Sequence, residues 1–262
     1  MRTANLNYST RFAHAVRPFV ATSVLALAAT GCQKSDEPTQ QDYNDVATSV
    51  GSLVAGGGGE LTSIKDSVTT AQGDIPVGFT GNGSGQLEGT HGGLSYSYEV
   101  TCAGADGVTM SVCDATTDSA SLIVDWSGNY DGDYWQLEIS RTGEWNVTGL
   151  QSDVAVFTGG GTFDVSSTSQ SLDGRRDRSF ELSYAGAYDI QWDMVAEKVL
   201  EGTINYEVHA ERHVDGAAAD RDAVFDISAE VIFDGSSAAR LVLDGSHSYN
   251  IDIDTGFVAA AQ

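Results

Sequence analysis

Proline, cysteine and basic residues are scarce in this chain of 262 residues, whereas glycine is abundant. The chain contains three prolines, three cysteines and 30 glycines, and 41% of its residues are hydrophobic. This apolar content excludes a disordered tail and indicates a folded domain with a sizeable core. The apolar segment at residues 18–29 is shorter than the roughly 20 residues that span a bilayer, which argues against a membrane-spanning helix there.

The shortage of basic residues excludes one class of partner. The chain has 13 Lys and Arg against 37 Asp and Glu, and three of the arginines precede residue 18. From residue 32 onward its formal charge is therefore −27. Such a surface repels phosphate backbones, so the sequence predicts no nucleic-acid binding. Anionic lipid headgroups are repelled in the same way, so attachment to a membrane would need a lipid.

The N-terminus has the pattern of an export signal. Arg2, Arg11 and Arg17 lie before or at the edge of the apolar segment 18–29, and no acidic residue occurs before Asp36. A basic region, a short apolar run and small residues before a cleavage site are typical of a secretory signal peptide. We therefore expect the chain to be exported.

The end of this segment, "LAATGC" at residues 27–32, resembles the lipobox of bacterial lipoprotein precursors. The resemblance is limited to the signal segment and Cys32. It implies a Cys32 that carries diacylglycerol and a fatty acyl group such as palmitate, although Ala29 stands where the family usually has Leu. Gln33 implies, again by resemblance, sorting to the outer membrane, with the domain facing the periplasm or the cell surface. Stable anchoring needs more than one acyl chain, which this modification supplies. The alternative is an ordinary secretory signal.

The other two cysteines form an even pair. Without Cys32, Cys102 and Cys113 remain in an exported chain, so the sequence predicts a disulfide between them. A two-residue turn at Asp106 and Gly107 would place Cys102 opposite Ser111, so the bridge requires a longer loop or a bulge near residues 103–107. A metal site made of two thiols alone is the less expected alternative.

The pattern of residues divides the chain into four parts. Residues 1–31 form the signal peptide, 32–42 the acylated cysteine and a polar tether, 43–72 a helical segment, and 73–262 an antiparallel β domain. In the helical segment, apolar residues recur at helical spacing on both sides of a glycine run at 56–59. No Lys-Ser or Lys-Thr follows this run, so it is interpreted as a linker that ends one helix and not as a phosphate-binding loop.

From about residue 75 onward, apolar and polar residues alternate. The segments "TINYEVHAERHV" at 203–214 and "VFDISAEVIF" at 224–233 show this most clearly. Strict alternation is typical of antiparallel strands with one buried and one solvated face. Glycine-rich clusters predict turns between the strands, among them "TGGG" at 158–161, and Gly161 and Gly186 are predicted to open strands just after turns.

The sequence therefore predicts a mostly β fold. We expect an antiparallel meander of ten to twelve strands forming a barrel or a strongly bent sheet, with one or two short N-terminal α-helices against it. Its interior would either enclose a cavity for an apolar ligand or be filled by Tyr, Trp and Phe. Outer-membrane barrels alternate in the same way. The separate lipid anchor and the ending "GFVAAAQ", without a terminal aromatic residue, argue against that class.

One stretch carries weak candidates for a metal site. Glu207, His209, Glu211 and His213 lie on one face of a predicted strand. Neighbours in this series would lie roughly 6–7 Å apart along the strand, so His209, Glu211 and His213 would need help from another strand to hold a metal. Ala210 stands where the H-E-x-x-H motif requires glutamate. A solvated outer face is the alternative interpretation.

A second stretch resembles part of a calcium-binding loop. Asn129, Asp131 and Asp133 alternate as calcium ligands would, but Tyr134 replaces the glycine that such a loop requires. An acidic hairpin tip is the alternative. No G-x-S-x-G nucleophile motif occurs in the chain.

These observations predict a lipid-anchored envelope lipoprotein without enzymatic activity and without a cofactor. The domain would bind an apolar ligand, or it would have a structural or surface role with an envelope protein as partner. The alternative is a periplasmic or surface metal-dependent hydrolase that uses His209, Glu211 and His213.

Overall fold

The computed structural model describes residues 37–55, 59–81, 85–91, 94–132, 135–170, 177–215 and 221–261. All of them belong to one compact unit of the chain, Lys34–Gln262. The predicted signal peptide, Cys32 and the first part of the predicted tether lie outside the described residues, so the lipobox resemblance stays a prediction.

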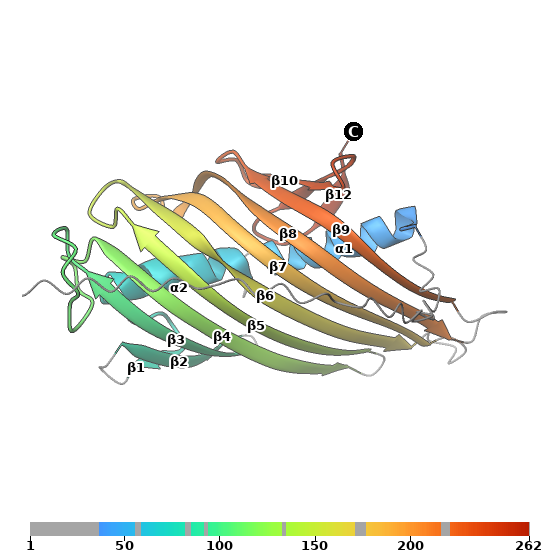
Figure 1. Cartoon of the computed structure of the whole chain (residues 1–262), viewed down its shortest axis with the longest axis horizontal. Coiled ribbons are helices and arrows are strands. Elements are labelled where there is room, and N and C mark those ends of the chain that lie inside the picture. Colours follow the sequence, from blue (N-terminus) through green and yellow to red (C-terminus); the bar gives the residue numbers. More distant parts are fainter. Residues whose placement is uncertain are drawn as a thin grey trace, which may run out of the picture. The chain divides into compact units, whose positions relative to one another are not determined.

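In the described part of the chain, twelve antiparallel strands form one sheet, in which strands pair in chain order (Figure 1). The strands are β1 (Phe79–Gly81), β2 (Gln86–His91), β3 (Leu94–Ala103), β4 (Ser119–Gly132), β5 (Trp135–Thr148), β6 (Val154–Gln170), β7 (Asp177–Asp193), β8 (Lys198–Asp215), β9 (Arg221–Phe233), β10 (Ala238–Leu243), β11 (His247–Asp252) and β12 (Val258–Ala260). The predicted antiparallel meander is confirmed.

The sheet is not closed into a barrel, so that alternative was wrong. Among the described residues β1 and β12 are the two edges of the sheet, and they do not pair with each other. Each of these edge strands has only three residues. Such short edges offer few backbone groups for a further ladder, which is one way in which proteins keep a sheet open without aggregation.

Side chains alternate between the two faces of the sheet as predicted. In β3, Leu94, Tyr96, Tyr98, Val100 and Cys102 are buried, and the residues between them are exposed. Because successive residues of a strand point to opposite faces, this pattern separates an apolar face from a polar one. We call the buried face the inner face and the solvated face the outer face.

Among the residues that the structure describes, two α-helices precede the sheet, α1 (Gln40–Val54) and α2 (Glu60–Ala71). Helix α1 begins three residues before the predicted helical segment because Thr39 caps it. The backbone N–H of Asp42 donates to the Thr39 hydroxyl, and the Asp42 carboxylate accepts from the backbone N–H of Thr39 at 2.9 Å. This capping box satisfies two N–H groups that a helix start otherwise leaves unpaired. Neither of these described helices has the length and apolar character needed to cross a membrane.

Both helices lie on the inner face of the sheet (Figure 1). Helix α1 contacts β10, β11 and β12, and α2 contacts β3, β4 and β5. Contacts that hold the start of α1 include a hydrogen bond from Gln40 Nε2 to the Tyr249 hydroxyl and a stack of Tyr43 on His247 with 3.7 Å between ring centroids. The apolar side chains that the helices bury are Val46, Ala47, Val50, Leu53 and Val54 of α1 and Ile64, Val68 and Ala71 of α2.

The prediction of a turn at residues 158–161 was wrong. This segment lies in the middle of β6, and Gly186 lies in the middle of β7. Across the sheet Gly143 pairs with Gly161, and Gly161 pairs with Gly186. By the alternation of the strands all three lie on the inner face, and we call them the glycine row. Glycine at these positions allows close packing across the sheet.

Candidate functional site

A charged cluster is buried between α2 and the middle of the sheet. Arg141 Nη2 from β5 donates to Glu60 Oε2, at the start of α2, and to the Tyr188 hydroxyl of β7 at 2.8 Å. The Tyr188 hydroxyl in turn donates to Glu60 Oε1 at 2.7 Å. The side chains of Glu60 and Arg141 are each 1% exposed. We call these three residues the acid–arginine cluster.

Aromatic rings surround the guanidinium of this cluster. The Arg141 Cζ atom lies 4.4 Å from the ring centroid of Trp145, 5.4 Å from that of Trp126 and 5.7 Å from that of Tyr188. A cation within about 6 Å of a ring face is attracted by the ring quadrupole, and the attraction is strongest where water is excluded. The cage therefore stabilises a positive charge at the centre of the inner face.

The protonation of the cluster follows from its burial. Burial raises the pKa of the Glu60 carboxyl above its ordinary value, against the opposing effects of Arg141 and Tyr188. Burial lowers the pKa of Arg141, but the charge of Glu60 outweighs this effect, so the pKa of the guanidinium is raised. Burial likewise raises the pKa of the Tyr188 hydroxyl, which therefore stays neutral. Arg141 is thus a permanent buried cation.

Several buried donors in and around the cluster have no acceptor among the described residues. Among the described residues, Arg141 Nη1, Trp126 Nε1, Trp145 Nε1 and the Tyr206 hydroxyl are buried and have no hydrogen-bond partner. A buried polar group without a partner costs about 1–3 kcal/mol. The inner face therefore offers more donors than α2 uses.

The glycine row makes room for this cluster. A Cβ atom at Gly143 would lie 2.8 Å from Trp145 Nε1. One at Gly186 would lie 3.1 Å from both the Tyr188 hydroxyl and the Tyr206 ring. Contacts this close would force the neighbouring rings to shift, so a larger residue at either position would disturb the cluster.

No motif marks the acid–arginine cluster in the sequence, although the alternation of β5 contains a signal for it. Arg141, Gly143 and Trp145 are separated by single residues, so a strand places all three on the same, buried face. Arginine at a buried position is rare unless it has a charged partner. The partner could not be found in this way, because Glu60 stands at a helix start, where acidic residues are common.

A second buried acid joins α1 to the sheet. Arg212 Nη1 of β8 donates to Asp42 Oδ1, and the Asp42 side chain is 1% exposed whereas that of Arg212 is 15% exposed. Each helix therefore presents an acidic residue of its first turn to an arginine of the inner face. The helix dipole favours negative charge at this position.

The predicted metal ligands lie on the outer face of β8 and do not converge. His209 Nδ1 lies 2.7 Å from Asp226 Oδ1, and His213 Nδ1 contacts Asp222 Oδ1, so each histidine is engaged by the residue opposite it on β9. Glu211 Oε1 is 3.4 Å from His209 Nε2. Within the described residues, no group of three or more His, Cys, Asp or Glu is arranged to hold a metal ion.

The predicted calcium loop cannot be compared with the structure. Asn129 is exposed near the end of β4, whereas Asp133 and the side chain of Asp131 lie outside the described residues.

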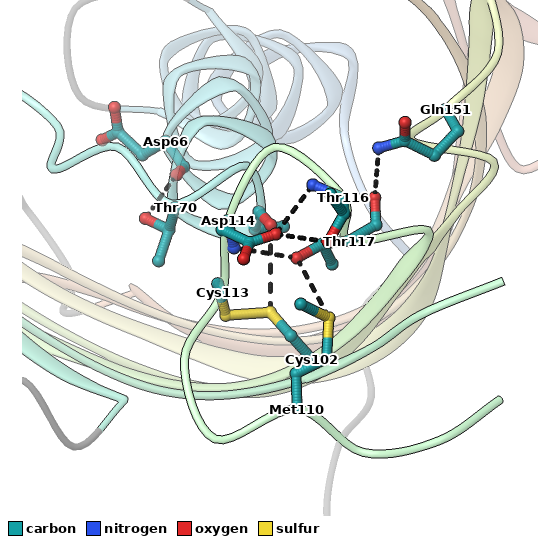
Figure 2. The surroundings of a disulfide bond; sticks show 10 residues. Asp66, Thr70, Cys102, Met110, Cys113, Asp114, Thr116, Thr117 and Gln151 are labelled. Atoms are coloured by element: carbon teal, nitrogen blue, oxygen red, sulfur yellow. Dashed lines mark hydrogen bonds between the residues drawn. A yellow bond between two sulfur atoms is a disulfide. The ribbon is translucent and has the colours of Figure 1, made fainter. Parts of the chain in front are cut away.

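The predicted disulfide is present. Cys102 and Cys113 are joined with 5.5 Å between their Cα atoms (Figure 2). Cys102 Sγ lies 3.8 Å from the carbonyl oxygen of Ala71, the last residue of α2. A Cβ at Gly73 would lie 2.6 Å from the carbonyl oxygen of Cys113. The disulfide loop therefore packs tightly against the C-terminal end of α2.

The loop is longer than a two-residue turn, as the predicted bridge requires. Gly104 N donates to Val108 O at 3.1 Å, and Met110 N donates to Cys102 O at 2.8 Å. Cys102 thus faces Met110, one position from the Ser111 that a two-residue turn would place there. Figure 2 shows Met110 and Thr117 beside the bridge.

The outer face has a shallow depression that is mainly polar. It is open, has a volume of about 540 Å³ and lies over β1 to β4. Its lining is mainly polar and includes Thr80, Glu88, Ser97 and Asp125. Apolar ligands prefer pockets lined by hydrophobic and aromatic side chains, so the inner face is the stronger candidate for a ligand site.

No protein-family model, no curated protein and no solved structure matches this chain. Its function is therefore inferred from the chemistry of the inner face.

Proposed function

We propose that the chain is a lipoprotein held in the outer membrane through acylated Cys32, and that its sheet binds an apolar ligand on the inner face without catalysing a reaction. The observation that supports this proposal most is the set of buried donors on the inner face that α2 leaves unpaired. The lipid anchor is supported by the lipobox resemblance alone, and the ligand by the described residues.

Two buried serines of α2 donate to carbonyl groups of their own segment. Ser63 Oγ donates to Gly59 O at 3.2 Å, and Ser67 Oγ donates to Ser63 O at 2.7 Å. On the other side, the indole N–H groups of Trp126 and Trp145 find no acceptor among the described residues. Helix α2 therefore pairs Arg141 and Tyr188 through Glu60 but leaves these two indole donors unpaired. A ligand with an apolar body and a polar group would pair them better.

The lining of the inner face suits such a ligand. Trp126 contacts Phe163 with 5.3 Å between ring centroids, Phe163 contacts Tyr184 at 5.8 Å, and Trp145 contacts Phe157 at 5.2 Å. Sites for small apolar molecules are typically lined by aromatic side chains with a few polar groups that fix orientation. The inner face has both.

The acidic outer face supports a location next to a membrane but not on it. A formal charge of −27 after residue 31 keeps the domain soluble and repels anionic headgroups. The acyl chains of Cys32 would then be the attachment, with the domain in the periplasm or at the cell surface.

Mass spectrometry of an organic extract tests the ligand. The unlipidated domain, residues 33–262, is purified from the periplasm and extracted with solvent. We expect a stoichiometric apolar molecule. A clean extract, together with failure of the purified domain to bind oleyl alcohol, would overturn the proposal and leave a structural role at the surface.

Fractionation tests the anchor. The full chain is expected in the membrane fraction and labelled by radioactive palmitate, whereas Cys32→Ala is expected to be soluble and unlabelled. Equal fractionation of both would contradict the lipid anchor.

A further inference from the structure

The Glu60 carboxylate is bound to the inner face in the manner of a ligand. It comes from a helix and not from the sheet, and it meets a guanidinium and a phenol within an aromatic cage. Recognition of a carboxylate needs no more than these groups, because arginine and hydroxyl donors are its usual partners. Any carboxylate that reached Arg141 would find the same partners.

Glu60 uses only part of what the site offers. Arg141 donates to Glu60 through Nη2, while Nη1 has no partner within the described part of the chain. Arginine binds a carboxylate best through two parallel N–H···O bonds. A carboxylate that is not fixed to a helix backbone can adopt that arrangement. It can also approach Trp145 Nε1, another buried donor without a partner there.

The two ends of α2 are held differently. At its C-terminal end, the disulfide loop packs against Ala71 and Gly73. At its N-terminal end, Gly59 provides no side-chain hydrogen bond to cap the helix, in contrast to the capping box of α1. The first turn of α2 is held to the sheet by the ion pair of Glu60 and by burial of Ser63 and Ile64. Loss of the ion pair would remove the charged contact of this turn, while the disulfide loop would keep the last turn in place.

The surface below α2 is suited to an alkyl chain. Ile64, Val68 and Ala71 of α2 are buried against the sheet. Alkyl groups can replace such side chains on an aromatic lining, since burial of each methylene group is favourable. A long chain with an acid at one end would therefore cover the same surface as α2 and pair the same arginine as Glu60.

From these contacts we infer the class of ligand: a long-chain carboxylic acid, whose carboxylate displaces Glu60 from Arg141 and Tyr188 and whose chain takes the place of the first turns of α2. This inference rests on the proposed function and adds the head group to it. Glu60 is then a built-in competitor that occupies the site when no ligand is bound.

Paired probes test the head group. Oleate and oleyl alcohol have the same chain and differ in the acid. Binding of each to the domain of residues 33–262 is followed by tryptophan fluorescence, because Trp126 and Trp145 surround Arg141. Oleate is expected to bind at least about tenfold more tightly than oleyl alcohol, as one additional charge-assisted hydrogen bond implies.

Three variants distinguish recognition of the carboxylate from binding of the alkyl chain. Glu60→Gln keeps the size of the side chain and removes the competing charge, so it should strengthen oleate binding about tenfold. Binding of oleyl alcohol should be strengthened less, because it gains only from the looser first turn of α2. Asp42→Asn is the matched control, because it removes the corresponding acid of α1 and should change neither probe. Glu60→Gln combined with Arg141→Gln avoids an unpaired buried charge and should abolish the preference for oleate. Circular dichroism verifies that each variant is folded.

Each outcome decides one question. Equal binding of both probes would show that the carboxylate is not recognised. The inferred head group would then be wrong, and the proposed function would stay in place. Binding of neither would overturn both. Tighter binding of oleyl phosphate, the phosphate monoester of oleyl alcohol, than of oleate would overturn the carboxylate in favour of a phosphate head group.

Discussion

Glu60 at the start of α2 and Arg141 in the middle of β5 form an ion pair from which solvent is almost excluded, each side chain being 1% exposed. Removal of one partner leaves an uncompensated buried charge, which costs about 3–5 kcal/mol. We therefore expect Glu60→Ala to lower the free energy of unfolding by about that amount, measured by urea denaturation.

The matched control replaces both charges. Glu60→Leu with Arg141→Met removes the pair and keeps apolar volume, and such replacements are often neutral or stabilising. We expect the double variant to be more stable than Glu60→Ala. A double variant as unstable as the single one would show that packing at these positions, and not the lone charge, determines the loss.

Much of the fold could be predicted because alternation is a local property. In β3, the buried residues Tyr96, Tyr98 and Val100 are separated by single exposed residues, and this pattern is visible in the sequence. Closure is not local, since it depends on whether β1 and β12 meet. For that reason the sequence left barrel and open sheet as alternatives, and only the structure decides between them.

The candidate site could be predicted only in part, for a related reason. The alternation of β5 identifies Arg141 as a charged residue at a buried position. Its partner Glu60 cannot be found in this way, because it lies 81 residues earlier in the chain. The glycine row was misread because Gly161 and Gly186 are also typical of turns. Their role depends on pairing across three strands, which sequence spacing does not show.

The glycine row gives a second prediction. Gly143→Ala would bring a Cβ within 2.8 Å of Trp145 Nε1, and such overpacking costs about 1–3 kcal/mol. Gly104→Ala is the control, because its Cβ would meet only the exposed Asp106 carboxylate at 3.3 Å. We expect a change within about 0.5 kcal/mol for the control. Equal urea midpoints for the two variants would contradict the packing role of Gly143.

The disulfide gives a third prediction. Cys102 and Cys113 are 11 residues apart, and closing a loop of this size stabilises a fold by about 2–3 kcal/mol. Cys113→Ser should lower the free energy of unfolding by that amount. Dithiothreitol should lower the stability of the wild type to the same level and leave Cys113→Ser unaffected. Insensitivity of the wild type to the reductant would contradict a stabilising bridge.

Zinc should not stabilise the domain. His209 and His213 are engaged by Asp226 and Asp222 across the strand pair, so no common site is formed on the outer face. We expect the same unfolding temperature with and without zinc, for the wild type and for His209→Ala combined with His213→Ala. A rise with zinc in the wild type alone would favour the metal-dependent hydrolase.

The pair of His209 and Asp226 predicts a weak dependence of stability on pH. The hydrogen bond with Asp226 raises the pKa of His209 above its ordinary value of 6.5. A raised pKa in the folded state means that the stabilisation is complete below the unfolded value of about 6.5 and is lost as the pH rises through the folded value. Both side chains are largely exposed, so we expect at most about 0.5 kcal/mol, further reduced by salt.

Titration of His209 by NMR measures the shift directly. Asp226→Asn should bring the pKa of His209 closer to 6.5, because it removes the first cause of the shift and leaves only the weaker contact with Glu211. The stability of this variant should fall below that of the wild type on the acid side of 6.5 and match it in alkaline solution. A difference that grows as the pH rises would have the wrong sign for a protonated histidine partner, and it would show that Asp226 stabilises the strand pair by another contact.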